Sequence, residues 1–506
     1  MNGREWLLAA LVVILLQAVP ANQLSPVWID EQVTYYIARG RTPDTVWSRA
    51  FEQSATPPGF FWLVAASSSV GDAVGIGSPE FWLRLPSLIA YLASMLIAWG
   101  MARREFGPSA ASATAVIFAI HRAGAGMAME SRPYAVGLLL GLIALECLLR
   151  LRHSKQWRWS AGIFFWSALA ALPWMHYLFA VLYLPAFLQV VFSKEYVGFR
   201  RRLVAGMVVA GLFSLPLIPG FLRIREISAF LETISETSIT SSFRNLLHVK
   251  GLAAAIATAF VLGRFPLRTS SSRFQGPPHS GWAWILIWWL LPMSTLIVVS
   301  IVRRQPTLAT LHYSLPVFGP FAVVIAGMFA SLSRGRFAAF AALVYMFVSI
   351  HGVETWKRIR QPQWMNSEWK WAGELLREQA GTADIAFVQS GLVEVNLTPI
   401  KYADVAFQEY ATSMLSELYA GGGFRRLALP YEFPKPGGEF LVDYSRRVED
   451  ARKAKAKVWL VIHPDFEERC QRGFERWIRD QGFRTEIVRQ NEFVHVLRCE
   501  ALSTPD

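Results

Sequence analysis

Residues 6–20 read WLLAALVVILLQAVP, and residues 28–36 read WIDEQVTYY. The first segment is almost continuously apolar, which predicts a membrane-spanning helix close to the N-terminus. Asp30 and Glu31 follow this helix by only a short connection, at a level where ionisable groups of membrane proteins are commonly functional. The same acids also suit the first turn of a helix, because Asp is a frequent N-cap and Glu interacts favourably with the helix dipole.

The composition excludes an ordinary soluble globule. Of the 506 residues, 53% are hydrophobic, with 20 Trp and 34 Phe, so several long apolar spans are expected. The net charge of +13 does not indicate a nucleic-acid partner, because Lys and Arg cluster in short loops between apolar runs, as the positive-inside rule requires. The sequence therefore predicts a polytopic α-helical membrane protein.

The apolar runs predict about eleven transmembrane helices. Residues 59–66 are too short to span and are expected to lie at the interface, within a first outer loop over residues 22–81 that carries juxtamembrane helices. The predicted spans are residues 6–20, 83–101, 109–121, 133–149, 160–174, 177–193, 203–220, 249–263, 282–301, 312–330 and 337–351.

The basic loops fall on one side of the membrane under this count. They contain Arg103 and Arg104, then Arg150 to Arg158, Lys194 to Arg202, Arg264 to Arg273, and Arg334 with Arg336. The positive-inside rule makes that side cytoplasmic, which places the N-terminus inside and the C-terminus outside. Acidic and histidine-bearing loops then share the outer face; these are the loops with Asp30 and Glu31, residues 121–132, His176, residues 223–250 and residues 303–312.

After the last span, the composition changes to that of a soluble domain. We therefore divide the chain into a transmembrane part, residues 1–354, and an extracytoplasmic α/β domain, residues 355–506. Helices are predicted at 368–377 and 466–481, and strands at 385–388, 457–462 and 492–497. A disulfide between Cys470 and Cys499 is left open, since both lie in a compartment where disulfides persist. The three cysteines fit no zinc spacing.

The outer loop that ends in Glu130, Ser131, Arg132, Pro133 and Tyr134 brings a second acid to the level of Asp30. Arg132 has the geometry to hold a phosphate through two hydrogen bonds. A purely structural interpretation remains, in which Glu130 favours the dipole of the next helix and Arg132 reaches the lipid headgroups.

Several of these segments together resemble the bacterial glycosyltransferases of the GT-C superfamily, in particular the branch of protein O-mannosyltransferases and the aminoarabinose transferase of lipid A. The resemblance covers most of the chain. It is carried by Trp28 to Glu31, the Pro57-Pro58 aromatic stretch, Phe81 to Pro86, Glu130 to Tyr134, and His312 to Pro316. At His312-Tyr313 the sequence departs from the expected Arg-Tyr, which leaves a phosphate role for His312 open.

The resemblance implies an enzyme of the bacterial cytoplasmic membrane that takes a sugar from a polyprenyl-phosphate carrier and passes it, with inversion, to a lipid, glycan or protein acceptor. Asp30 is the expected general base, and Glu130 is the second carboxylate expected to take part in catalysis. Glu31 or Glu130 could exchange roles with Asp30. Arg132, Arg303 and Arg304 are expected to stabilise the leaving phosphate. The other expected substrate-binding residues are Glu31, Tyr134, His176, Tyr177, His312 and Tyr313.

Three alternatives stay open at this point. A divalent cation held by Asp30 and Glu130 is compatible with their oxygen ligands, but no metal site is assigned. A transporter or lipid flippase would have a similar number of spans, yet it should show internal repeats and charged residues near the membrane midplane, and no repeat is seen. A membrane-anchored binding protein would work through residues 355–506 alone.

Overall fold

The computed structural model describes residues 3–154, 156–228, 249–264, 279–303, 315–333, 337–349, 351–361, 368–430, 433–434, 438–462, 468–490 and 494–502. The chain forms two compact units. The helical unit comprises Met1–Ser25 and Thr56–Trp364, and the α/β unit comprises Pro26–Ala55 and Met365–Asp506. Residues 26–55 thus associate with the C-terminal part of the chain, whereas the sequence-based division grouped them with the transmembrane residues 1–354.

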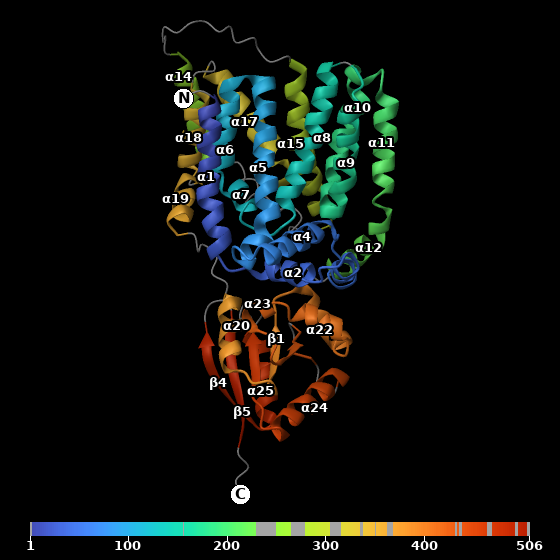
Figure 1. The fold of residues 1–506 in the computed structure, drawn as a ribbon, viewed down its shortest axis with the longest axis vertical. Helices are drawn as coiled ribbons and strands as arrows, with labels where there is room; N and C mark the ends of the chain where they lie inside the picture. Colours follow the sequence, from blue (N-terminus) through green and yellow to red (C-terminus); the bar gives the residue numbers. More distant parts are fainter. Residues whose placement is uncertain are drawn as a thin grey trace. The chain divides into compact units, whose positions relative to one another are not determined.

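The helical unit is a bundle of apolar helices (Figure 1). Its main helices are α1 (Gly3–Leu24), α4 (Gly59–Val74), α5 (Pro79–Phe106), α6 (Pro108–Ile120), α7 (Arg122–Met127), α8 (Tyr134–Ser154), α9 (Trp159–Met175), α10 (Tyr183–Phe192), α11 (Arg200–Leu212), α12 (Ile218–Ser228), α14 (Val249–Arg264), α15 (His279–Arg303), α17 (Phe318–Leu332), α18 (Ala338–Val348) and α19 (His351–Arg360). Helix α6 buries every residue from Ala110 to Ala119, because it packs against α1, α5, α17 and α18.

Within the described residues, six helices are long and apolar enough to cross a membrane, or seven if the bent pair α18 and α19 counts as one span. A multi-pass membrane protein is therefore confirmed, but the expected number of about eleven spans is not. The difference lies in short elements. The predicted span 109–121 is a helix of 13 residues, and the predicted span 177–193 opens as the 3₁₀ helix η2 (Tyr177–Leu182) before α10 begins.

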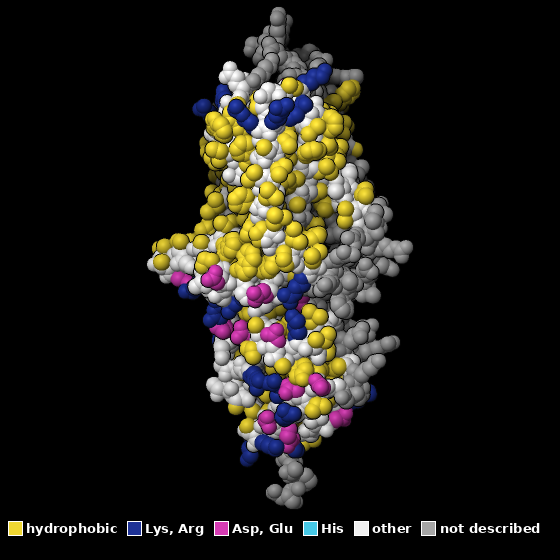
Figure 2. All heavy atoms as spheres, turned by 90° about the vertical axis from the view of Figure 1, so that its right-hand side faces the viewer, with side chains coloured by type: hydrophobic (Ala, Val, Ile, Leu, Met, Phe, Trp, Pro, Cys, Tyr) yellow, Lys and Arg dark blue, Asp and Glu magenta, His cyan; other side chains and the backbone are white. Residues whose placement is uncertain are grey.

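One end of the helical unit carries an ion-pair network. The guanidinium of Arg104 in α5 donates two hydrogen bonds of 2.7 Å to the carboxylate of Glu146 in α8. Arg150 donates to the same carboxylate at 2.6 Å, and His153 lies 2.8 Å from Glu105. Figure 2 shows Lys and Arg side chains gathered at this end, beyond a flank of hydrophobic side chains. The first two predicted basic loops therefore do meet on one side.

The α/β unit has a five-stranded sheet in the order β2-β1-β3-β5-β4. β1 (Ile385–Gln389) is parallel to β2 (Arg425–Ala428) and to β3 (Val458–Ile462), while β5 (His495–Ala501) is antiparallel to β3 and to β4 (Phe483–Gln490). The predicted strands at 385–388 and 457–462 are confirmed as β1 and β3, and the strand predicted at 492–497 is confirmed from His495 onward as β5. β2 and β4 were not predicted, because one has only four residues and the other is mostly exposed at the sheet edge.

Side-chain alternation along the strands gives this sheet a core on each face. Ala386, Val388, Trp459 and Val461 belong to one core, together with residues of α20 (Glu368–Gln379) and α22 (Val405–Ala411). Phe387, Val458 and Leu460 face the other core, which is covered by α24 (Glu439–Lys453) and α25 (Glu468–Asp480). The helix predicted at 368–377 is confirmed as α20, and the helix predicted at 466–481 as α25.

The segment from residue 26 to residue 55 packs on the first of these cores. It contains α2 (Ile29–Ala38), α3 (Pro43–Trp47) and the π-helical turn η1 (Ser48–Gln53). Ile29, Val33 and Tyr36, which follow helical spacing along α2, pack against the core that includes Tyr410. The sequence left a Cys470–Cys499 disulfide open; Cys499 is a buried free thiol in β5, and the side chain of Cys470 lies outside what the structure describes.

Candidate active-site residues

The loop that carries Glu130 and Arg132 is anchored on α5 by two hydroxyl groups. Ser131 Oγ donates to the carbonyl oxygen of Leu83 at 2.8 Å, and Ser87 Oγ donates to the carbonyl oxygen of Arg132 at 3.1 Å. Each is a contact between residues more than forty positions apart. The segments 81–86 and 130–134, which the sequence singled out separately, are therefore neighbours.

Pro86 is tolerated inside α5 because a side chain of α4 replaces the hydrogen bond that the proline removes. Pro86 lacks the N–H that would donate to the carbonyl of Trp82 in a regular helix. Ser67 Oγ of α4 donates to that oxygen at 2.7 Å, which satisfies an acceptor that the proline leaves open. The short aromatic helix α4 is thereby fixed against the start of α5.

Three of the predicted substrate-binding residues come together in the helical unit. Arg132 Nη2 donates to the hydroxyl of Tyr134 at 3.1 Å, and the guanidinium carbon lies 5.5 Å from the centroid of the Tyr134 ring. The ring centroids of Tyr134 and His176 are 6.4 Å apart. A cation, a phenol and an imidazole thus line one position where α8 begins and α9 ends.

His176 is neutral in this setting. Burial, and secondarily the positive charge of Arg132, lowers the pKa of His176 to about 3. Its Nδ1 accepts a hydrogen bond from the backbone N–H of Leu178 at 3.2 Å, so the remaining ring proton is on Nε2. A neutral imidazole of this kind is able to donate one hydrogen bond to a substrate oxygen without adding charge.

Helix α8 connects the cluster of Arg132, Tyr134 and His176 to the opposite end of the bundle. Tyr134 is the first residue of the 21-residue helix, and Arg150 and Arg152 lie in its last turns. At 1.5 Å per residue the helix is about 30 Å long, which is the thickness of a bilayer core. The Arg132, Tyr134 and His176 cluster therefore lies at the end of the bundle opposite the ion-pair network.

Glu130 is half-buried and lies within electrostatic reach of Arg358 in α19. Arg358 is buried, and its Nη1 donates to the carbonyl oxygen of Arg122 at 3.3 Å. Sequence reasoning missed Arg358. The only available signal was a basic residue on a strongly amphipathic helix at the end of the last apolar run, a common position for an interfacial anchor.

In the α/β unit, Asp30 and Glu31 lie in the first turn of α2 and have different surroundings. Glu31 is fully buried, and its carboxylate accepts a hydrogen bond from the backbone N–H of Trp28 at 3.3 Å, as the third residue of a capping box does. Asp30 is half-buried. The hydrogen bond to Trp28 gives Glu31 a structural role as a cap of α2. Asp30 lies one residue earlier in the same turn.

A carboxylate that the sequence analysis missed lies near Asp30. Glu394 belongs to the 3₁₀ helix η8 (Val393–Leu397), and Tyr410 is hydrogen-bonded to its carboxylate. Burial raises the pKa of Glu394, and the negative charge of Asp30 raises it further. Two interacting carboxylates with different environments are the usual basis for separating a base from an acid. No sequence spacing links residues 30 and 394.

The remaining predicted positions are only partly described. Tyr177 begins η2, and its buried hydroxyl has no hydrogen-bond partner in the described part of the chain. Arg303 is the last residue of α15, and Arg304, His312 and Tyr313 lie outside the described residues. Asp30 and Glu130 belong to different units, so their meeting in one site stays a prediction.

Among the described residues, no three His, Cys, Asp or Glu side chains lie close enough together to hold a metal ion. A divalent cation shared by Asp30 and Glu130 would join residues of the two units, and it stays open.

Comparison with known proteins agrees with this arrangement. Residues 55–219 match the family described as dolichyl-phosphate-mannose-protein mannosyltransferase, and no curated protein matches. ArnT from Cupriavidus metallidurans, solved bound to undecaprenyl phosphate, has a TM-score of 0.59 at 14% identity, with 97% of both chains covered. The arabinofuranosyltransferase AftD from Mycobacteria has a TM-score of 0.52 at 16% identity, over 99% of this chain and 40% of that chain. These structural likenesses show a shared fold.

Residues 55–219 match a family of sugar transferases, and the chain as a whole shares its fold with solved sugar transferases.

Proposed function

We propose that the protein transfers a sugar from a polyprenyl-phosphate carrier to an acceptor hydroxyl, with inversion at the anomeric carbon. The observation that carries this proposal is the cluster of Arg132, Tyr134 and His176, which lies opposite the basic end of the bundle. By the positive-inside rule the basic end faces the cytoplasm. The cluster then lies at the outer face of a bacterial cytoplasmic membrane, where lipid-linked sugars are exposed.

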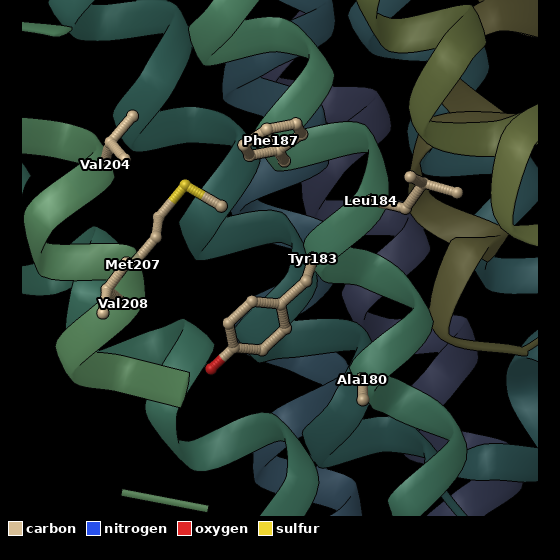
Figure 3. Close-up of a pocket in the computed structure, with 7 residues that line it drawn as sticks. All are labelled: Ala180, Tyr183, Leu184, Phe187, Val204, Met207 and Val208. Carbon is tan, nitrogen blue, oxygen red and sulfur yellow. The ribbon is translucent and has the colours of Figure 1, made fainter. Parts of the chain in front are cut away.

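An apolar groove beside this cluster supports a lipid-linked donor. It has a volume of about 440 Å³ and lies between η2 and α10 on one side and α11 on the other (Figure 3). Ala180, Tyr183, Leu184 and Phe187 recur at helical spacing along one wall, and Val204, Met207 and Val208 along the other. Such facing apolar ridges suit a linear hydrocarbon chain.

The position of the groove connects the lipid to the cluster. Its wall begins at Ala180 in η2, the same 3₁₀ helix that follows His176 directly. An isoprenoid chain that occupies the groove would therefore place its phosphate near His176 and Arg132. Arg132 is suited to bind that phosphate, because guanidinium groups hold phosphate oxygens through paired hydrogen bonds.

The chemical step needs a general base for the acceptor hydroxyl, whereas the phosphate leaves as a stable anion and needs no general acid. The acceptor oxygen attacks the anomeric carbon as the bond from that carbon to the phosphate oxygen breaks, and the polyprenyl phosphate leaves as an anion. We assign Asp30 as the general base that takes the acceptor proton, a role that contributes about 10²–10⁴-fold in rate. Arg132 stabilises the charge that develops on the leaving phosphate.

The environment of Asp30 favours this assignment. Glu394 has a raised pKa, so it holds its proton more readily than an ordinary glutamate, while Asp30 is the partner whose charge contributes to that shift. Glu130 would bind the sugar or acceptor hydroxyl groups in the complete site. Glu31 is a weaker candidate for a catalytic role, because its carboxylate already caps α2.

The test is a transfer assay with purified protein, a radiolabelled polyprenyl-phosphate sugar and a panel of acceptors. Asp30→Asn and Glu130→Gln should each lower the turnover by about a hundredfold or more. Asp44→Asn is the matched control, since Asp44 is exposed in the first turn of α3. Full activity in both site variants would refute the proposed roles. Movement of the lipid across vesicles without sugar transfer would replace the transferase by a flippase.

A further inference from the structure

A polar pocket lies within the α/β unit, and the proposed reaction does not use it. Its volume is about 260 Å³. Tyr36, Arg39 and Arg49 from α2 to η1 line one side. Ser413 and Ser416, which follow α22, line the other side together with Arg426 of β2. The pocket exists because residues 26–55 pack on the C-terminal part of the chain.

Two hydroxyl groups in this pocket are buried without a hydrogen-bond partner. Ser413 is 3% exposed and Ser416 is 5% exposed, and neither Oγ atom is hydrogen-bonded within the described part of the protein. Ser416 is the N-cap of α23 (Glu417–Ala420), but its side chain does not cap the helix, although serine commonly does so. Leaving a buried polar group unpaired costs about 1–3 kcal/mol. The two hydroxyls therefore indicate a ligand that supplies the missing hydrogen bonds.

The arginines of the pocket are held by neighbouring groups, and not every one of them is paired with a carboxylate. Arg49 Nη1 donates to the carbonyl oxygen of Tyr36 at 2.6 Å, and its guanidinium carbon lies 4.4 Å from the centroid of the Tyr36 ring. Among the described residues, no carboxylate forms an ion pair with Arg49. Arg39 and Arg426 share one partner, Glu417.

The charge balance of the pocket is positive. Three arginines line it against two carboxylates, Glu409 and Glu417. The carboxylates and serines are suited to the hydroxyl groups of a sugar, and the free donors of Arg49 are suited to an anion. A pocket slightly below the usual range of about 300–1,000 Å³ for ligand sites fits a ligand of one or two sugar rings.

We propose that this pocket binds an acidic sugar of the acceptor molecule, with a carboxylate or phosphate group on Arg49 and hydroxyl groups on Ser413 and Ser416. This inference rests on the proposed sugar transfer, because only a transferase needs a site that recognises the acceptor. The pocket is distinct from the Arg132 cluster, which is proposed to hold the donor.

The binding experiment uses the full-length protein in lipid nanodiscs and saturation-transfer NMR with three probes: methyl glucuronide, glucose 6-phosphate and methyl glucoside. At least one anionic probe should bind about tenfold more tightly than the neutral one. The response to the first two probes tells whether the anion is a carboxylate or a phosphate. Equal affinity for the neutral probe, or binding of none of the three, would overturn the proposal.

The serines supply the decisive variant. Ser413→Ala combined with Ser416→Ala removes two unpaired hydroxyls, so the melting temperature should stay the same or rise, while probe affinity falls about tenfold. Arg49→Gln should abolish the preference for the anionic probe. Arg447→Gln is the control, since Arg447 pairs with Asp443 in α24 outside the pocket. Unchanged affinity in the double serine variant would show that the pocket does not hold the ligand.

The same proteins separate this inference from the transferase proposal. Loss of transfer in Glu130→Gln with probe binding intact is the expected pattern. If the protein binds the probes but transfers no sugar from any carrier, the proposed function is overturned and the assignment of the pocket stands. Transfer of normal efficiency to acidic acceptors by the double serine variant would overturn the pocket and leave the proposed function.

Discussion

Arg132 and Tyr134 face each other across one residue at the start of α8, with the guanidinium donating to the phenol oxygen at 3.1 Å. This contact fixes the direction of a cation that, in the proposed mechanism, receives the charge of the leaving phosphate. The phenol ring also lies below the guanidinium at cation–π distance.

Tyr134→Phe should lower kcat by about tenfold, equivalent to about 1.4 kcal/mol, because Arg132 loses the hydrogen bond that orients it and keeps only the ring contact. The melting temperature should change little. Tyr196→Phe is the comparison: its buried hydroxyl donates to the carbonyl of Leu148 at 2.9 Å near the ion-pair network. That variant should lose stability and keep its kcat. Equal kcat values for Tyr134→Phe and wild type would remove Tyr134 from the site.

The low pKa of His176, about 3, makes a prediction about acid stability. The folded state binds fewer protons than the unfolded state, whose histidine titrates near 6.5. Stability is therefore fully present above pH 6.5 and falls as the pH decreases toward 3, by about 2 kcal/mol at pH 5. His176→Asn keeps an acceptor for the Leu178 N–H and removes the titration.

Thermal unfolding of both proteins between pH 7 and pH 5 checks this. The wild type should lose more stability than His176→Asn over that interval. Parallel curves for the two proteins would show that His176 is not held neutral by its surroundings.

Glu394 should make the opposite contribution. Its pKa is raised in the folded state, so its contribution to stability is present at pH values below the ordinary glutamate pKa and is lost as the pH rises through the raised value. Glu394→Gln should therefore melt at a higher temperature than wild type at pH 8, and the difference should shrink at pH 5. Glu378→Gln, an exposed change in α20, should show no such trend. A wild type that gains stability relative to Glu394→Gln with rising pH would contradict the assignment.

The groove between α10 and α11 can be filled by one substitution. Val208→Trp should raise KM for a donor with a long polyprenyl chain, by about tenfold, because the larger side chain occupies the space of the hydrocarbon. A short-chain analogue that does not reach the groove should be used equally well by both proteins.

Val209→Trp is the matched control for this experiment. Val209 is the next residue of α11 and is 52% exposed, but it does not line the groove. If both tryptophan variants affect the long-chain donor equally, the effect belongs to the membrane-facing surface of α11 and the groove assignment fails.

Much of the architecture could be predicted from local patterns. Long apolar runs predicted α1, α5, α8 and α15, because a segment of about twenty apolar residues has few other stable environments. Short, continuous apolar runs predicted the central strands β1 and β3. The short elements were harder: α6 ends after 13 residues and η2 precedes α10, and hydropathy alone does not mark such breaks.

The amino-acid sequence by itself determined a membrane protein with a basic end, a C-terminal α/β domain, and a set of acids, arginines and histidines in the connecting loops. Only the tertiary structure placed Glu394 near Asp30, joined Ser131 to Leu83, and enclosed Ser413 and Ser416 in a pocket with Arg49. The physical reason is that hydrophobic periodicity is a local property of the chain. Proximity between residues hundreds of positions apart depends on how the apolar faces pack, and no single stretch of sequence records that packing.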